Sequence, residues 1–277
     1  MHGIGNDYIY VNCFEQQVAN PQDLAKRLSD RHFGIGADGL VLILPSETSD
    51  LQMRMFNADG SEAKMCGNAV RCIAKYAYER GLRKKTTLSL ETQSGEKTLY
   101  LEINDGCVER VRVDLGEPAF AVSAIPVLSR LEEIINEPIP SDAPFPAVIS
   151  ALKTTCVSVG NPHAVLFVPD IPDKLVNELG PVIENHPMFP DRTNVEFVKV
   201  IGREEIRMRV WERGSGETLA CGTGAAAAVA AGIRNGLLDR KVLVHLLGGD
   251  LFIEWAQDNH IYKSGPAAFV FDGVVEV

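Results

Sequence analysis

The sequence contains two copies of one pattern, related by a constant shift of 155 positions with no gap. The shift superimposes segments of both polar and apolar character: Gly5-Asn6 on Gly160-Asn161, Met53-Arg54-Met55-Phe56 on Met208-Arg209-Val210-Trp211, Glu62 on Glu217, Cys66-Gly67 on Cys221-Gly222, and Gly81-Leu82 on Gly236-Leu237. Chance similarity rarely keeps one register over nearly 80 positions, and an internal repeat means that each copy forms the same structural unit. The sequence therefore predicts two pseudo-symmetric domains.

Two domains also suit the chain length of 277 residues. The first copy ends near residues 114–116, and a proline-rich stretch, Pro138 to Pro146, lies between the halves. We place the boundary near residue 117, with residues 1–117 forming the N-terminal half and residues 118–265 the C-terminal half.

Composition restricts the class of protein. A hydrophobic content of 45% with 23% charged residues is typical of a soluble globular protein, and no apolar run is long enough to predict a membrane span. The net charge of −10 disfavours nucleic acid and anionic membrane surfaces, because binding to either requires a basic patch. The first residues, Met1 to Asp7, lack the features of a signal peptide, which predicts a cytoplasmic protein. We expect a small-molecule substrate and no nucleic-acid or membrane partner; a homodimer is left open.

The six cysteines show no CxxC motif and no regular spacing with histidines. The sequence therefore predicts no metal site and no disulfide framework. In a reducing compartment these residues are expected to be free thiols.

Strand-like runs in both halves predict an α+β fold in which a curled, mostly antiparallel sheet surrounds a central helix. In the first half the expected strands are Tyr8 to Cys13, Leu40 to Leu44, Leu51 to Phe56, Thr87 to Thr92, Lys97 to Ile103 and Val108 to Leu115. In the second half they are Thr155 to Val159, Ala164 to Val168, Val195 to Val200, Ile206 to Trp211, Lys241 to Leu246 and Leu251 to Trp255.

A helix is expected to begin near each repeated cysteine and to end at a glycine fifteen residues later, Gly81 or Gly236. The second of these helices is apolar all round from Ala225 to Ala231 and must be enclosed. Surface helices are expected at Pro21 to Ser29 and Asp170 to Leu179.

The repeated cysteines, Cys66 and Cys221, are the candidate catalytic residues. At a helix N-terminus the unpaired amides favour a thiolate, so we expect the thiol pKa to fall below its usual value of about 8.5. Gly67-Asn68 and Gly222-Thr223-Gly224 leave backbone amides accessible, so that a carboxylate can accept hydrogen bonds from both helix ends.

Two thiols on opposite sides of an α-carbon suit stereochemical inversion, because one can remove the α-proton while the other delivers a proton to the opposite face. Such chemistry needs no cofactor in principle, but it needs preorganised donors to stabilise the carbanion. The four other cysteines, at positions 13, 72, 107 and 156, are interpreted as small hydrophobic residues without a catalytic role.

Several polar residues stand beside strand ends or turns: Asn6, Asn57, Asn161, Asn194 and Glu212-Arg213. Asparagine is common in turns, so each one alone is more often structural. Arg213 precedes the Gly214-Ser215-Gly216 turn and could hold a carboxylate with two hydrogen bonds. His163 either faces the same cleft or is a buried histidine with its hydrogen bonds satisfied.

A set of ordered motifs closely resembles the diaminopimelate epimerase family: His2-Gly3-Ile4-Gly5-Asn6-Asp7, Asn57-Ala58-Asp59-Gly60-Ser61, Cys66-Gly67-Asn68, Gly160-Asn161-Pro162-His163, Thr193-Asn194-Val195, Glu212-Arg213-Gly214 and Ala220-Cys221-Gly222-Thr223-Gly224. The resemblance runs nearly end to end, and it implies a cofactor-independent isomerase that interconverts LL- and meso-2,6-diaminopimelate, a precursor of lysine and peptidoglycan.

The resemblance also implies roles for individual residues. Cys66 would abstract the proton from the LL isomer and Cys221 would reprotonate, with the roles exchanged in reverse. Asn68, Gly222 and Thr223, together with Gly67, would hold the reacting carboxylate. The rest of the substrate would be bound by Asn6, Asn57, Asn161, Asn194, Glu212 and Arg213. A C-terminal strand at residues 266–277 would return to the first domain.

Two features depart from the family pattern. Many relatives carry Phe-Asp-Gln where this chain has Ala37-Asp38-Gly39, so any contact made by that glutamine is not transferred. Relatives also usually begin several residues before the Met-His-Gly motif, so we expect a short first strand.

Three alternatives stay open at this level. The first is a racemase of another amino acid on the same fold, such as proline or hydroxyproline; a cyclic substrate would leave Arg213 without a second carboxylate. The others are a non-catalytic ligand binder and a thiol redox sensor in which the two cysteines join on oxidation.

Overall fold

The computed structural model describes residues 1–140 and 152–276. The chain divides into two compact units, Met1–Asp114 together with Ser264–Val277, and Leu115–Lys263. We call them unit 1 and unit 2. Of the proline-rich stretch that the sequence places between the halves, residues 141–146 lie outside the described residues.

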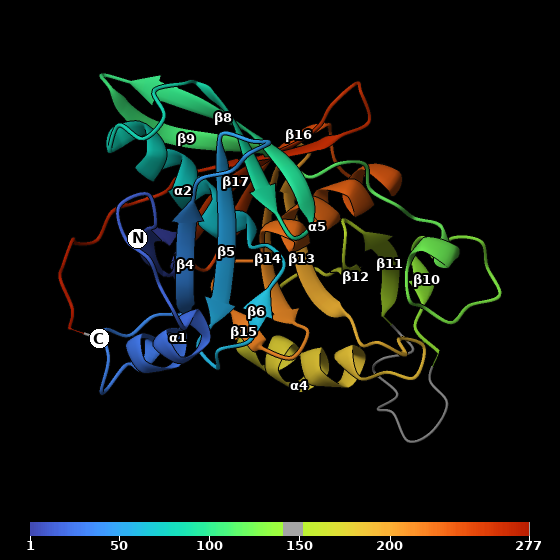
Figure 1. Ribbon diagram of the computed structural model, residues 1–277. Coiled ribbons are helices and arrows are strands. Elements are labelled where there is room, and N and C mark those ends of the chain that lie inside the picture. The colour runs from blue at the N-terminus through green and yellow to red at the C-terminus, as the bar shows by residue number, and fades with distance from the viewer. Residues whose placement is uncertain (141–151, 277) are drawn as a thin grey trace. The chain divides into compact units, whose positions relative to one another are not determined.

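Unit 1 contains a sheet with the strand order β9-β8-β7-β5-β4-β3, in which a short β6 pairs with β5. Strands β4 and β5 lie side by side in Figure 1. The strands are β3 (Ile9–Asn12), β4 (Gly39–Leu44), β5 (Leu51–Asn57), β6 (Glu62–Ala63), β7 (Thr87–Thr92), β8 (Gly95–Asn104) and β9 (Cys107–Asp114). A separate hairpin joins β1 (His2–Gly3) to β2 (Asn6–Asp7) through Ile4 and Gly5, both of which have positive φ. Helix α1 (Pro21–Ser29) contacts β4 and β5, while α2 (Gly67–Glu79) contacts β8 and β9.

Unit 2 repeats this order as β12-β13-β14-β16-β17-β18 and adds β11 and β10 beyond β12. Its strands are β10 (Glu137–Pro138), β11 (Lys153–Ser158), β12 (Pro162–Phe167), β13 (Asn194–Gly202), β14 (Glu205–Glu212), β15 (Gly216–Thr218), β16 (Lys241–Leu246), β17 (Gly249–Trp255) and β18 (Ile261–Gly265). Its helices are η1 (Val122–Ala124), α4 (Asp173–Glu184) and α5 (Gly222–Arg234).

Strand pairing preserves the repeat residue by residue. In matching registers, Ile9 and Leu40 correspond to Ala164 and Val195, and Leu40 and Phe56 correspond to Val195 and Trp211. Helices α2 and α5 have equivalent bounds under the same shift of 155. The two units differ by one residue in the register of the next strand pair. Leu51 lies opposite Leu90 in unit 1, whereas its counterpart Ile206 lies opposite Val244, one position before the counterpart of Leu90. The predicted α+β fold with pseudo-symmetric halves is confirmed, although each sheet also contains parallel pairs such as β3–β4 and β12–β13.

The central helix of unit 2 is enclosed as its composition predicts. Every residue from Ala225 to Ala231 is fully buried, and α5 contacts β11, β12, β13 and β17. Small side chains allow the backbone of α5 to approach these strands closely. The start of α5 therefore has a position fixed by the strands around it.

Two predicted segments differ from the structure. The helix expected at Asp170 to Leu179 is α4, which begins after the cap residue Pro172 and continues through Pro181. The segment expected to return to the first half does belong to unit 1, but it does not form the expected strand at residues 266–277: within 266–276 only a single bridge, from Ala268 to His2, is formed. The reason is that β1 has only two residues before its turn, so it offers no longer edge for pairing.

Within residues 1–140 and 152–276, no helix is both long enough and apolar enough to cross a membrane.

Candidate active site

Cys66 is the N-cap residue of α2, with extended backbone angles (φ −130°, ψ 121°). Its Sγ donates a hydrogen bond to Asn6 Oδ1 at 3.3 Å, and Asn68 Nδ2 donates to the same oxygen at 3.3 Å. Three residues expected from the sequence, Asn6, Cys66 and Asn68, therefore meet at one amide oxygen. Cys66 itself is partly exposed.

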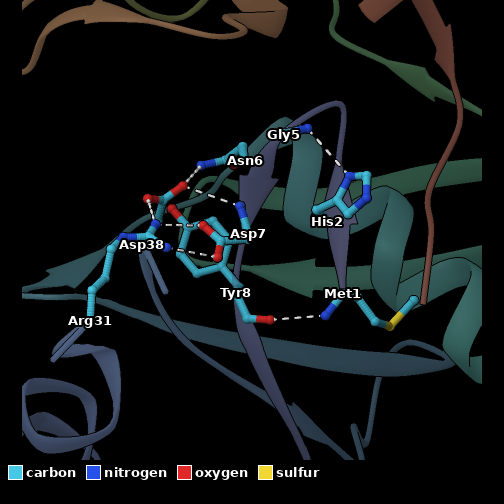
Figure 2. Close-up of polar contacts among 8 residues, drawn as sticks. All are labelled: Met1, His2, Gly5, Asn6, Asp7, Tyr8, Arg31 and Asp38. Atoms are coloured by element: carbon cyan, nitrogen blue, oxygen red, sulfur yellow. Dashed lines mark hydrogen bonds and ion pairs between the residues drawn. The ribbon is translucent and has the colours of Figure 1, made fainter. Parts of the chain in front are cut away.

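The amide of Asn6 is held from its other side by a carboxylate (Figure 2). Asn6 Nδ2 donates to Asp38 Oδ2 at 2.7 Å, and the backbone N–H of Asp7 donates to the same oxygen at 3.1 Å. Arg31 bridges the carboxylates of Asp7 and Asp38 at 2.8 and 3.0 Å. Because the Asp38 carboxylate only accepts, it fixes which end of the Asn6 amide faces Cys66.

A buried arginine supports the first turn of α2. Arg71 is fully buried; its Nη1 donates to Gly67 O and to Asn68 Oδ1 at 3.1 and 3.0 Å, and its Nε donates to Pro266 O at 3.1 Å. Burial lowers the pKa of Arg71 from its usual value. The guanidinium ties the first turn of α2 to the backbone at Pro266 and so makes it rigid.

Tyr8 also lies close to the N-terminal end of α2. Burial, and next the neighbouring Cys66, raise the pKa of the Tyr8 phenol. A Cβ at Gly39 would lie 2.9 Å from Tyr8 Cε1 and 2.1 Å from Phe56 O. The position where relatives carry glutamine thus has no room for a side chain here, because β5 and the Tyr8 ring occupy the space.

The equivalent residue of unit 2, Cys221, is the N-cap of α5 and is buried. Its Sγ accepts a hydrogen bond from Gly224 N at 3.4 Å and lies 3.5 Å from Thr223 Oγ1. A Cβ on Gly222 would lie 2.2 Å from Lys263 Nζ. A side chain at the first position of this helix would therefore displace Lys263 from where it lies.

The expected lowering of the thiol pKa is wrong for Cys221. Burial raises the pKa of Cys221 well above its usual value, and the carboxylates of Glu212 and Glu196 raise it further. The hydrogen bonds from Thr223 and Gly224 act in the opposite direction but are smaller. Desolvation thus outweighs the favourable helix end, and Cys221 carries its proton at neutral pH.

Next to Cys221 lies a polar cluster formed by the buried residues His163 and Glu196 and the half-buried Asn161. His163 Nδ1 is hydrogen-bonded to Glu196 Oε1 at 2.7 Å, and His163 Nε2 to Asn161 Oδ1 at 2.9 Å. His163 and Glu196 are both fully buried. The imidazole of His163 is therefore a satisfied buried group, and both its hydrogen-bond partners are identified.

The Arg213 turn is anchored at two successive backbone amides. Arg213 N donates to Asn194 Oδ1 at 3.0 Å, and Gly214 N donates to Glu184 Oε1 at 2.8 Å. The guanidinium Nη1 of Arg213 donates to Asp191 O at 3.1 Å. Asn194 and Glu184 therefore hold the backbone from which the Arg213 side chain projects.

The structure places the remaining predicted residues, Glu212 and Asn57, at the ends of two strands. Glu212, at the end of β14, accepts a hydrogen bond from Thr218 Oγ1. Asn57, at the end of β5, donates from Nδ2 to Ser61 Oγ at 3.0 Å and lies in that turn, not in the Asn6–Cys66 network. In the described part of the chain, no group of three or more His, Cys, Asp or Glu side chains is placed to hold a metal ion.

Sequence reasoning missed five residues that surround the two helix ends: Tyr8, Asp38, Arg71, Glu196 and Lys263. The repeat could have revealed Tyr8, because a shift of 155 places it on His163, which was a candidate. The others have no repeated counterpart of the same type, since their equivalents are Thr193, Ala226, Val41 and Val108.

Comparison with known proteins extends the resemblance to the whole chain. The sequence profile of the family described as diaminopimelate epimerase matches residues 1–121 and 155–270. The chain belongs to the diaminopimelate epimerase family. A diaminopimelate epimerase of Acetivibrio thermocellus is 54% identical, with 100% of this chain and 97% of the relative covered. One from Methanococcus maripaludis is 51% identical, with 100% and 98% covered.

Solved structures share the fold of this diaminopimelate epimerase family member at low identity. A phenazine biosynthesis protein of the PhzF family from Bacillus anthracis has a TM-score of 0.67 at 18% identity, covering 99% of this chain and 95% of its own. A hydroxyproline epimerase from Agrobacterium vitis has a TM-score of 0.63 at 14% identity, covering 96% and 86%. At these identities the likeness shows the fold alone.

Proposed function

We propose that this protein interconverts LL- and meso-2,6-diaminopimelate by moving an α-proton between two cysteines, without a cofactor. One observation carries the proposal: each unit starts a helix at a Cys-Gly pair, in a chain whose whole length aligns with diaminopimelate epimerases. The protein is accordingly an isomerase of amino-acid biosynthesis, in the route to lysine and peptidoglycan.

In this proposal Cys66 and Cys221 act on the α-carbon from opposite faces. When the LL isomer is converted into the meso isomer, the Cys66 thiolate takes the α-proton, and Cys221 gives its proton to the other face of the carbanion. The high pKa of Cys221 supports its role as the acid. The backbone amides at Gly67, Asn68, Gly222 and Thr223 would receive the α-carboxylate, since helix N-termini favour anions.

The distal end of the substrate carries a second carboxylate and a second ammonium group. Arg213 would bind this carboxylate, because a guanidinium matches a carboxylate with two hydrogen bonds. Asn6, Asn57, Asn161, Asn194 and Glu212 would complete the polar surroundings, with His163 supporting Asn161. Asn194 contributes through the backbone amide of Arg213 as well.

A racemase of proline or hydroxyproline has less support. The solved hydroxyproline epimerase is 14% identical, whereas diaminopimelate epimerases are 54 and 51% identical over the whole chain. Direct comparison of substrates separates the two activities. In deuterated water, LL-2,6-diaminopimelate is expected to gain one deuterium at the inverted α-carbon, as read by mass spectrometry and NMR. Proline incubated in parallel is expected to stay unlabelled, and faster labelling of proline would overturn the proposal.

We also propose that the protein works in the cytoplasm. All six cysteines are free thiols, and a reducing compartment keeps them in that state.

We also propose that the protein forms a homodimer. The observation behind this proposal is an open edge of the sheet in unit 1. In unit 2 strand β11 covers β12, with Val157 opposite His163, but the equivalent strand β3 ends the strand order of its sheet. A groove of about 1030 Å³ in unit 1 runs beside β3 and the C-terminal segment. Apolar side chains of that segment, Phe271 and Val274, are 63 and 103% exposed.

An open edge beside exposed apolar side chains favours pairing with a second copy. Sedimentation velocity at micromolar concentration is expected to show a dimer, and Phe271→Asp is expected to shift it toward monomer. Sedimentation of the unchanged protein as a monomer would contradict this.

A further inference from the structure

Glu196 is a carboxylate that the sequence did not single out, and it lies in the centre of unit 2. It stands on β13, is fully buried and is hydrogen-bonded through Oε1 to His163. Its other oxygen, Oε2, has no hydrogen-bond partner among the described residues. Burying a carboxylate in this way is costly, so its presence here calls for a specific explanation.

The position of Glu196 relative to α5 follows from Gly224. A Cβ built on Gly224 would lie 2.8 Å from Glu196 Oε1 and 3.3 Å from Cys221 Sγ. The carboxylate oxygen and the sulfur are therefore within about 6 Å of each other, close enough for strong electrostatic coupling. A side chain at position 224 would push the Glu196 carboxylate away from this place.

We propose that Glu196 is a positioning residue that keeps Cys221 protonated between turnovers, with His163 holding its carboxylate against the first turn of α5. The inference deepens the proposed function, because it assigns the group that sets the proton state of one of the two thiols. Glu196 acts through Cys221 and touches no reacting atom itself.

The electrostatics of the site support this role. Burial raises the pKa of Glu196 itself, and the interaction with His163 acts against that rise. In its ionised form Glu196 disfavours a thiolate on Cys221, because two like charges would then share a desolvated space. Burial is the first cause of the raised pKa of Cys221, and Glu212 and Glu196 add to it. Three other titratable groups lie close by: His163 on β12, which is hydrogen-bonded to Glu196; Cys156 on β11, which interacts with Glu196; and Lys263 on β18, whose Nζ lies near Gly222.

The proton balance for conversion of the LL isomer into the meso isomer shows why the proton on Cys221 matters. The C–H bond at the α-carbon breaks and its proton forms an S–H bond on Cys66. The Cys221 S–H bond then breaks, its proton joins the carbanion electron pair in a new C–H bond, and a thiolate remains on Cys221. The starting state returns when Cys66 gives its proton to solvent and Cys221 takes one from solvent, and repulsion from Glu196 favours the protonated form of Cys221.

The test measures the thiol directly and uses no substrate. In a Cys66→Ser background, the rate of alkylation of Cys221 by iodoacetamide is followed against pH by mass spectrometry of its peptide. Glu196→Gln removes the charge and keeps the shape, and we expect the midpoint of the alkylation profile to fall by about one pH unit. Glu196→Asp keeps the charge and is expected to retain more of the original midpoint than Glu196→Gln.

Glu184→Gln is the matched control, because Glu184 is another buried carboxylate of unit 2 that contacts Trp211, Gly214 and Arg192 instead. It should leave the midpoint in place. If Glu196→Gln does not fold, Glu196→Leu combined with His163→Leu removes both buried polar groups together and tests the same shift. An unchanged or higher midpoint in the variant that folds overturns the inference. Epimerisation assays report separately on the proposed function, so the inference about Glu196 and the proposed function can fail independently.

Discussion

Cys221→Ala is expected to abolish epimerisation while leaving deuterium exchange at the LL α-carbon. Cys66 would still remove the α-proton, but no acid would stand on the opposite face. The proton or deuteron then returns from Cys66, and the configuration is retained. Positioned acid–base groups contribute about 10²- to 10⁴-fold to rates, so we expect kcat for inversion to fall by about 10³-fold or more.

Cys66→Ala should also abolish inversion. Its deuterium exchange at the α-carbon of the meso isomer should be much slower than the exchange of Cys221→Ala on the LL isomer. Cys221 is buried, whereas Cys66 is partly exposed, so the proton on Cys221 exchanges less readily with solvent. NMR in deuterated water separates exchange from inversion in both variants. Cys107→Ala changes an exposed cysteine on β9 and serves as the control. Retention of more than a tenth of the inversion rate in either variant would exclude the two-thiol mechanism.

Arg213→Lys is expected to raise KM for diaminopimelate by about 10- to 100-fold, with a smaller change in kcat. Hydrogen bonds to charged groups contribute about 1.5 to 3 kcal/mol, and lysine cannot reproduce the paired donors of a guanidinium. The backbone at this position is anchored by Asn194 and Glu184, so the substitution changes the side chain and leaves its support intact.

Steady-state kinetics with both isomers measure this effect. Arg203→Lys is the matched control, since Arg203 forms an exposed ion pair with Asp239 at 2.6 Å. It is expected to leave KM unchanged. An unchanged KM in Arg213→Lys would mean that another group binds the distal carboxylate.

Much of the fold could be predicted because the chain repeats itself. The shift of 155 that aligns Cys66 with Cys221 also aligns strand registers such as Leu40 with Phe56 and Val195 with Trp211. Hydrophobic periodicity then predicts the helix at Pro21–Ser29, whose bounds agree with the structure. Short elements such as β6 and β15 were missed because two or three residues carry no periodic pattern.

The polar surroundings of the thiols could not be predicted in the same way. Asp38 reaches Asn6 across 32 positions, and Glu196 reaches His163 across 33. Glu196 stands between the apolar residues Val195 and Phe197 of β13, where a sequence pattern suggests a solvent-facing position. Only the packing of β12, β13 and α5 reveals that this carboxylate is buried.

The sequence alone determined the duplication, the two Cys-Gly helix starts and the family, because these features are written in local order and in a single spacing. The tertiary structure decided the proton state of Cys221 and the orientation of Asn6. Both depend on burial and on charges brought from distant strands, and the free energy of a buried ionisable group depends on everything packed around it.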